Sequence, residues 1–226
     1  MLVRDWMTEG SQNLGLETSL VDAAEIMRRR NIRQLPVIDE AGTLQGILSD
    51  RDVRDAMPSK YLPGDAGSMQ GTGLLQLKVK DVMSIDPVTI TPDAPVESAA
   101  LLLQQGKIGG LPVVDGEGRL TGIITEVDVY RYFCSVSGFT QEGLQLVFQL
   151  EDRPGTAIEL LSFLKDQDIR LISVLTSYNR VPAGFRHVSI RIQGTGRHNL
   201  ESLISMLESH YPLLYVLKDG RLASRD

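Results

Sequence analysis

Two segments of the chain place a hydroxyl residue at the end of a short apolar run and an aspartate three residues later. The first reads Gly-Ile-Leu-Ser-Asp-Arg-Asp and holds Ser49 and Asp52; the second reads Gly-Ile-Ile-Thr-Glu-Val-Asp and holds Thr125 and Asp128. A hydroxyl at this point can accept a hydrogen bond from a free backbone N–H of a helix that begins there. The same helix end attracts anions, and the aspartate can accept two hydrogen bonds from a diol such as ribose. The segments therefore predict a sugar-phosphate site that occurs twice, although an aspartate in the first turn of a helix can also be purely structural.

These segments belong to an internal repeat with a constant offset of 76 residues. Residues 3–7 (Val-Arg-Asp-Trp-Met) recur as residues 79–83 (Val-Lys-Asp-Val-Met), and Leu-Pro-Val at 35–37 recurs at 111–113. The repeat continues without a gap to about Arg54. Two copies without a third are typical of a pair of domains that pack face to face, and not of a solenoid.

Each copy predicts the order β-α-β-β-α, in which the two adjacent strands form a hairpin. Ser19 and Pro95 mark the start of the first helix in the two copies, because apolar residues at helical spacing follow each of them. The strand that contains Leu-Pro-Val then passes through an Asp-x-x-Gly turn into the strand that ends at Ser49 or Thr125. A closing helix follows directly.

This repeat resembles the CBS domain, a family whose members occur as tandem pairs called Bateman modules. The resemblance is carried by Val-x-Asp-x-Met, Leu-Pro-Val, Asp-x-x-Gly and the hydroxyl-plus-aspartate segment, which occur in the same order in both copies. It implies copies at residues 1–57 and 79–138, a Gly/Pro-rich linker at 58–78, and two clefts between the sheets. In that family adenine nucleotides commonly bind in these clefts, with the hydroxyl near phosphate and the aspartate on ribose.

Basic residues and glycines differ between the two predicted sites. Arg51 could bind phosphate in the first copy, whereas Val127 stands at that position in the second copy and Arg131 is the candidate there. Arg33 precedes the Leu-Pro-Val strand, which lines the cleft in the family, but it also ends a basic run that suits the end of a helix. Its counterpart Gly109 offers room and no charge, so we expect the two sites to differ in affinity or preferred ligand. The predicted nucleotide-binding residues are Ser49, Arg51, Asp52, Thr125, Asp128, Arg33, Pro36, Gly109, Pro112 and Arg131.

Beyond Gly138 the pattern changes to β-α-β-β-α-β, which is ferredoxin-like, so the predicted fold class is α+β. This order and the Asp152-Arg-Pro-Gly155 turn resemble the ACT domain, which would span residues 143–219. The resemblance implies sheets that pair across a dimer and an amino-acid effector near Asp152 and Gly155. The alternative is a plain strand-to-helix turn with Pro154 at the first helical position. The whole architecture resembles acetoin-utilisation (AcuB-type) CBS–ACT regulators.

Composition and charge argue against several classes of binding partner and cofactor. The net charge is −6 over 226 residues, which argues against a broad nucleic-acid-binding face. A single cysteine, Cys134, allows no intramolecular disulfide and is expected to pack within a helix. The first residues lack a signal-peptide pattern, and no apolar run reaches the ~20 residues of a membrane helix. We therefore expect a cytoplasmic protein without nucleic-acid or membrane partners. The three histidines lie far apart at positions without metal-ligand spacing, so no metal is expected.

These observations favour a non-catalytic regulator that binds AMP, ADP or ATP as a regulatory ligand and responds by a change of conformation. The ACT resemblance adds an amino acid as a second effector, and both resemblances imply a homodimer. The regulated protein stays unknown, and a role in acetoin or acetate metabolism follows from the family resemblance alone. The alternative is a structural interaction module whose clefts are empty.

Overall fold

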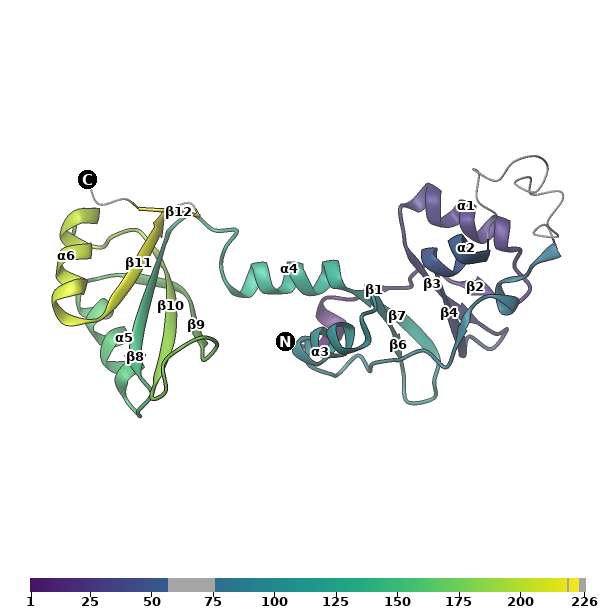
Figure 1. Cartoon of the computed structure of the whole chain (residues 1–226), viewed down its shortest axis with the longest axis horizontal. Helices are drawn as coiled ribbons and strands as arrows, with labels where there is room; N and C mark the ends of the chain where they lie inside the picture. Colours follow the sequence, from purple (N-terminus) through teal and green to yellow (C-terminus); the bar gives the residue numbers. More distant parts are fainter. Residues whose placement is uncertain (57–75, 219, 224–226) are drawn as a thin grey trace. The chain divides into compact units, whose positions relative to one another are not determined.

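The computed structural model describes residues 1–56, 76–218 and 220–223, so most of the predicted linker at 58–78 lies outside the described residues. The chain divides into two compact units, residues 1–132 and 133–226. The first unit contains both copies of the repeat up to Tyr132, and the second contains the last residues of the second copy together with the C-terminal α+β part (Figure 1).

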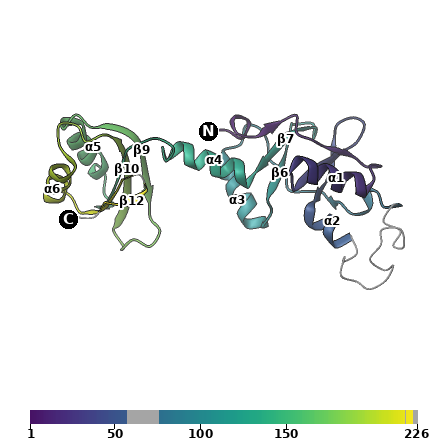
Figure 2. The ribbon, with the colours of Figure 1, turned by 90° about the horizontal axis from the view of Figure 1, so that it is seen from above.

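The first copy follows the predicted order, with a short additional strand before it. Its elements are η1 (Val3–Asp5), β1 (Thr8–Glu9), β2 (Leu14–Gly15), α1 (Leu20–Arg30), β3 (Gln34–Ile38), β4 (Leu44–Ser49) and α2 (Asp50–Ala56). Ser19 caps α1 as predicted, because its side chain accepts a hydrogen bond of 3.1 Å from the backbone N–H of Asp22. Leu20, Ala23 and Met27 are buried at helical spacing against the sheet. Helices α1 and α2 lie side by side in both views (Figures 1 and 2).

The second copy repeats this plan, except that its first strand is reduced to one bridge between Ile90 and Val113. Its elements are η4 (Val79–Asp81), β5 (Ser84–Ile85), α3 (Val96–Gly106), β6 (Gly110–Val114), β7 (Leu120–Thr125) and α4 (Glu126–Val136). Pro95 is the N-cap of α3, as predicted. The buried residues of α3 are Val96, Ala99 and Leu103, the counterparts of those in α1.

The opening segment of each copy completes the sheet of the other copy. Strand β1 pairs with β7 in the order β1-β7-β6, and β5 pairs with β4 in the order β2-β3-β4-β5. Equivalent backbone hydrogen bonds accompany the exchange: the N–H of Val3 donates to Ala94 O at 2.8 Å, and that of Val79 donates to Thr18 O at 2.9 Å. The two copies therefore form one interlocked pair with approximate twofold symmetry.

The second unit has the predicted ferredoxin-like topology. Its elements are β8 (Leu144–Glu151), α5 (Thr156–Asp166), β9 (Arg170–Ser177), β10 (Phe185–Gln193), α6 (Leu200–His210), β11 (Leu213–Lys218) and β12 (Arg221–Leu222). The sheet runs β12-β11-β8-β10-β9 with antiparallel neighbours throughout. Helices α5 and α6 lie on one face of this sheet, where their leucines form a core with alternate residues of the strands (Figure 1).

The start of α5 differs from the prediction. Helix α5 begins at Thr156, so Pro154 does not occupy the first helical position. The Thr156 hydroxyl donates to the backbone oxygens of Glu151 and Arg153, and Gly155 adopts a left-handed φ of +95° as the N-cap. The helix therefore begins two residues later than a helix with Pro154 at its first position would. Within the described part of the chain, no helix combines the length and the apolar character needed to span a bilayer.

The exchanged strands generate a prediction at Gly122. A Cβ atom at this position would overlap the backbone oxygen of Thr8 on β1, and backbone cannot move aside as a flexible side chain can. We expect Gly122→Ala to lower the free energy of unfolding by about 1–3 kcal/mol. Gly116→Ala is the matched control, because a Cβ there meets no atom within 4 Å. Urea denaturation measures both variants, and equal midpoints for the two would contradict the close strand pairing.

Candidate functional site

Both hydroxyl–aspartate pairs close the same hydrogen-bonded ring at the start of a helix. In the first copy, the Ser49 backbone N–H and hydroxyl both donate to Asp52 Oδ2 at 2.7 Å, and the Asp52 N–H donates to Ser49 Oγ at 3.2 Å. In the second copy, the Thr125 N–H and hydroxyl donate to Asp128 Oδ2 at 2.8 and 2.6 Å, and the Asp128 N–H donates to Thr125 Oγ1 at 3.4 Å. The predicted capping by the hydroxyl is confirmed. Each carboxylate therefore uses Oδ2 to hold its own helix and keeps Oδ1 for another partner.

The two Oδ1 atoms have different surroundings. Asp128 is 5% exposed, and its Oδ1 accepts a hydrogen bond from the Arg131 guanidinium. Asp52 is half-buried, and within the described part of the chain its Oδ1 has no partner. The counterpart of Arg131 in the first copy is Asp55, which cannot form such a pair. The sites are thus built on one plan but carry different charges beside the carboxylate.

The structure brings the other predicted polar residues to the same two helix starts. The Asp50 N–H donates to Arg33 O at 2.9 Å, and the Glu126 N–H donates to Gly109 O at 3.1 Å. Arg33 and Arg51 are both exposed beside the first cap. In the second copy, Gly109 adds no charge at this place. The first site therefore has two guanidinium groups, and the second has Arg131.

Pro36 and Pro112 have a different place from the polar residues. Both are buried within strands β3 and β6, opposite Ile47 and Ile123 of the neighbouring strands. A proline has no N–H to donate, which limits strand pairing at these positions. They can contribute apolar surface to a site but no hydrogen-bond donor.

Gln34 is a residue that the sequence analysis missed. A Cβ at Gly110 would overlap the Gln34 amide oxygen and lie 3.4 Å from Thr125 Cγ2, so the Gln34 amide of the first copy reaches the Thr125 side of the second copy. Its Oε1 is buried without a hydrogen-bond partner among the described residues. The available signal was its place directly before Leu-Pro-Val, opposite a glycine at the repeat offset. Gln34 is paired with Ser49, and Gly110 is paired with Thr125, in the two sheets. The contact between Gln34 and Gly110 therefore brings the two predicted sites close together.

Helix α4 is fixed one turn beyond Asp128. The Tyr132 hydroxyl donates to the Glu97 carboxylate on α3, and this hydrogen bond raises the pKa of Tyr132 to about 12 and lowers the pKa of Glu97. The Trp6 ring meets Tyr132 edge-on at a centroid distance of 5.4 Å. The opening segment of the first copy thus helps to position the helix that carries Asp128.

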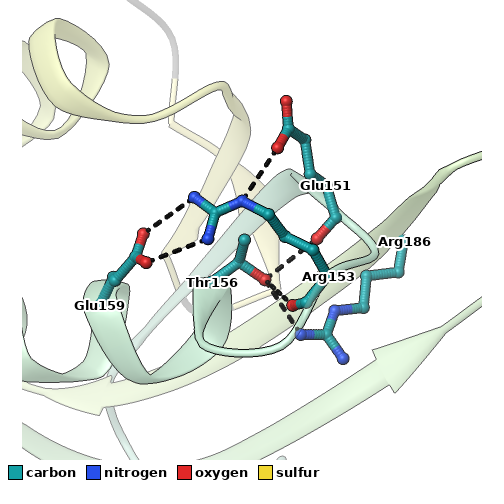
Figure 3. A network of polar contacts seen from close by, with 5 residues as sticks. All are labelled: Glu151, Arg153, Thr156, Glu159 and Arg186. Atoms are coloured by element: carbon teal, nitrogen blue, oxygen red, sulfur yellow. Dashed lines mark hydrogen bonds and ion pairs between the residues drawn. The ribbon is translucent and has the colours of Figure 1, made fainter.

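The Asp152–Gly155 turn in the second unit is held by hydrogen bonds between Arg153 and residues on either side of the turn, and by contacts of Thr156 (Figure 3). Arg153 bonds Glu151 at 3.1 Å and Glu159 at 3.2 Å, and Arg186 donates to the Thr156 hydroxyl at 3.1 Å. Asp152 lies 3.8 Å from an Arg186 nitrogen. These contacts account for the turn as a structural feature, and an effector at Asp152 and Gly155 remains a proposal.

Other candidate chemistry is sparse within residues 1–56, 76–218 and 220–223. No three His, Cys, Asp or Glu side chains gather there to hold a metal ion. Cys134, a residue of α4, is exposed, so the prediction that it packs within a helix was wrong. A shallow apolar groove beside Ile204, Leu213 and Tyr215 in the second unit contains none of the predicted residues.

Comparison with known proteins decides the family of the first unit. The CBS domain family matches residues 3–59 and 79–135, which are the two copies of the repeat. This chain belongs to the CBS domain family. A CBS domain-containing protein of Dictyostelium discoideum is 38% identical over 129 residues, which make up 57% of this chain and 88% of that protein. The tandem CBS pair predicted from the repeat is confirmed.

Two further relatives show what kinds of protein carry such a pair. The chloroplastic protein CBSX2 of Arabidopsis thaliana is 32% identical over 148 residues, covering 57% of this chain and 62% of that protein. One solved structure of CBSX2 has a TM-score of 0.52 at 29% identity and covers 61% of this chain and 96% of that one. L-aspartate semialdehyde sulfurtransferase of Methanocaldococcus jannaschii is 29% identical over 132 residues, but this chain spans only 23% of that enzyme. The likeness to the enzyme therefore concerns one part of it.

Proposed function

We propose that this chain is a non-catalytic regulatory protein that binds an adenine nucleotide at one or both hydroxyl–aspartate sites of its CBS pair. The observation that carries the proposal is the ring at each helix start, which holds a carboxylate rigidly and uses only Oδ2 to do so. A rigid carboxylate oxygen is suited to accept hydrogen bonds from ribose hydroxyls. Membership of the CBS family supports the proposal.

The phosphate would be bound differently in the two copies. Next to Asp52, the exposed guanidinium groups of Arg33 and Arg51 supply positive charge. Next to Asp128, the start of the 11-residue helix α4 supplies the positive end of a helix dipole. We infer that the first copy favours ligands with more phosphate charge, such as ADP or ATP, and that the second favours AMP.

A relative supports adenine as the base. CBSX2, which this chain resembles with a TM-score of 0.52, has also been solved in complex with AMP.

The Gln34 amide, with a buried oxygen that lacks a partner among the described residues, is a further polar group between the two sites. Ligand binding would favour one arrangement of the two copies over another, and the second unit would transmit or modify that change.

The second unit widens the proposal without naming its ligand. Its ferredoxin-like sheet and the Asp152–Gly155 turn support assignment as an ACT domain, with an amino acid as a second effector. We propose a cytoplasmic location and an unidentified protein partner, and acetoin or acetate metabolism as the pathway by analogy with proteins of this architecture.

A second candidate function is a structural interaction module with empty clefts. The observation that favours it is that both aspartates already have hydrogen-bond partners within the protein, so neither requires a ligand. The two functions differ in whether the Oδ1 atoms ever contact a small molecule.

Calorimetric titration with AMP, ADP, ATP and S-adenosylmethionine separates the two functions. We expect at least one of these ligands to bind the wild type. The double variant Asp52→Asn with Asp128→Asn keeps an oxygen for the helix caps but loses the charged acceptors. It should therefore bind at least about tenfold more weakly, the scale of one hydrogen bond to a charged group. Asp55→Asn, an exposed carboxylate on the same helix as Asp52, is the control and should bind like the wild type. Absence of heat with all four ligands at millimolar concentration would support the structural module.

We also propose that the chain forms a homodimer through the second copy. The outer faces of α3 and α4 expose Leu101 (51%), Val127 (69%) and Tyr130 (60%). The counterparts of these residues in the first copy are charged: Glu25, Arg51 and Arg54. An exposed apolar patch is complementary to a second copy of itself across a twofold axis, whereas a charged face is not. In the second unit, edge strand β9 also exposes apolar residues, namely Leu171, Val174 and Leu175.

The asymmetry between the copies makes the dimer testable by light scattering. We expect wild-type protein to have twice the 24.9 kDa chain mass at micromolar concentration. Leu101→Ser with Tyr130→Ser should weaken the dimer by at least about tenfold, because it removes apolar contact area. Glu25→Ser with Arg54→Ser makes the same change at the equivalent positions of the first copy and should leave the dimer intact. A monomeric wild type, or equal effects of the two double variants, would contradict this interface.

A further inference from the structure

In the second site, both oxygens of the Asp128 carboxylate already accept hydrogen bonds from the protein itself. Asp128 Oδ2 accepts two hydrogen bonds from Thr125, which use both of its lone pairs. Its Oδ1 accepts from Arg131, so one of the two acceptor positions that a ribose diol would need is already occupied. A ligand that uses this carboxylate must therefore displace Arg131 at least in part.

Arg131 is the member of this pair that can move. The Asp128 side chain is 7% exposed and is fixed by Thr125, whereas the Arg131 side chain is 60% exposed. An arginine has five N–H donors on a long flexible stem, so it can leave one acceptor and find another nearby. A phosphate group at the start of α4 is such an acceptor, because Arg131 lies in the second turn of that helix.

The first copy provides an internal comparison. Its counterpart of Arg131 is Asp55, an exposed acid on α2, and Asp52 Oδ1 has no partner among residues 1–56 or the rest of the described chain. The first site is therefore open before a ligand arrives, and the second is closed by an ion pair. The shared ring at Ser49 and Thr125 excludes the cap itself as the cause of this difference.

We propose that Arg131 is an exchangeable counter-ion that makes the second site select nucleotides over nucleosides. The inference rests on the proposed function and adds a specificity-determining residue to it. A nucleoside would break the pair with Asp128 and offer the freed guanidinium no new anion. A nucleotide breaks the same pair but supplies a phosphate that the guanidinium can bind, so Arg131 keeps an anionic partner while the carboxylate accepts hydrogen bonds from the ribose hydroxyls. Arg131 thus lowers the affinity of the second site for a nucleoside and raises its affinity for a nucleotide.

The test compares adenosine with AMP at the second site by calorimetry. The background variant Asp52→Asn weakens the first site so that the second is measured. In this background Arg131→Met removes the charge and keeps an unbranched apolar stem similar to that of arginine. We expect adenosine to bind roughly fivefold more tightly, the scale of one partly exposed ion pair. AMP should bind about tenfold more weakly, the scale of one hydrogen bond to a charged group. Opposite signs for two ligands are a result that a merely structural arginine would not give.

Two further variants complete the design. Arg131→Lys keeps the charge and should keep most of the preference for AMP, and it shows whether loss of fold explains the methionine variant. Asp55→Asn changes the equivalent position of the first copy and should alter neither ligand. A shift of adenosine and AMP in the same direction, or an unchanged ratio of their affinities, overturns the role of Arg131.

The outcomes also separate this inference from the proposed function. If wild-type protein binds neither adenosine nor any adenine nucleotide, the proposed function fails and this inference falls with it. If the wild type binds AMP but the Asp52→Asn background does not, the nucleotide function stands and the second site is not a ligand site, which overturns the role of Arg131.

Discussion

A carboxylate that caps its own helix has one oxygen left for other partners, and this constraint governs the CBS pair described above. In both copies a backbone N–H and a hydroxyl converge on Oδ2 of the aspartate that follows them by three residues. The cap fixes the aspartate side chain without contacts from other parts of the chain, since all of its partners lie within one turn. The position of Oδ1 is therefore set by the fold, and the character of each site depends on which group meets it.

The exchange of opening segments makes the two caps parts of one structure. Because β1 joins the sheet that ends at Thr125 and β5 joins the sheet that ends at Ser49, neither copy has a complete sheet by itself. Trp6 extends this dependence to Tyr132, one turn beyond Asp128. A change at one site can thus reach the other through backbone hydrogen bonds and packed side chains, which is the physical requirement for coupling between ligands.

Local relationships in this chain could be predicted from sequence, and distant ones could not. The caps at Ser49 and Thr125 involve residues three apart, and the helix starts at Ser19 and Pro95 depend on neighbouring residues, so their patterns are visible in the sequence. The constant offset of 76 then pointed to the CBS pair. The strand exchange joins segments far apart in sequence and has no local signature, and the approach of Gln34 to Gly110 arises only when the two copies meet. The position of Pro154 could not be predicted, because a proline before a helix is compatible with several turn geometries. The hydrogen bonds of the Thr156 hydroxyl stabilise the one that is observed. Arg131 as a phosphate ligand stays a prediction from the sequence, whereas its pairing with Asp128 could be found only from the side-chain positions.

The proposed function depends on whether ribose hydroxyls reach Oδ1 of Asp52, which has no partner in the described part of the chain, and Oδ1 of Asp128, which is paired with Arg131. A crystal structure of the full chain determined in the presence of AMP tests it most directly. We expect ribose hydroxyls on Oδ1 of Asp52 or Asp128, with the phosphate beside Ser49 or Thr125 at the start of the closing helix. Ordered AMP bound elsewhere on the chain, with both aspartates in contact only with the protein, would contradict it.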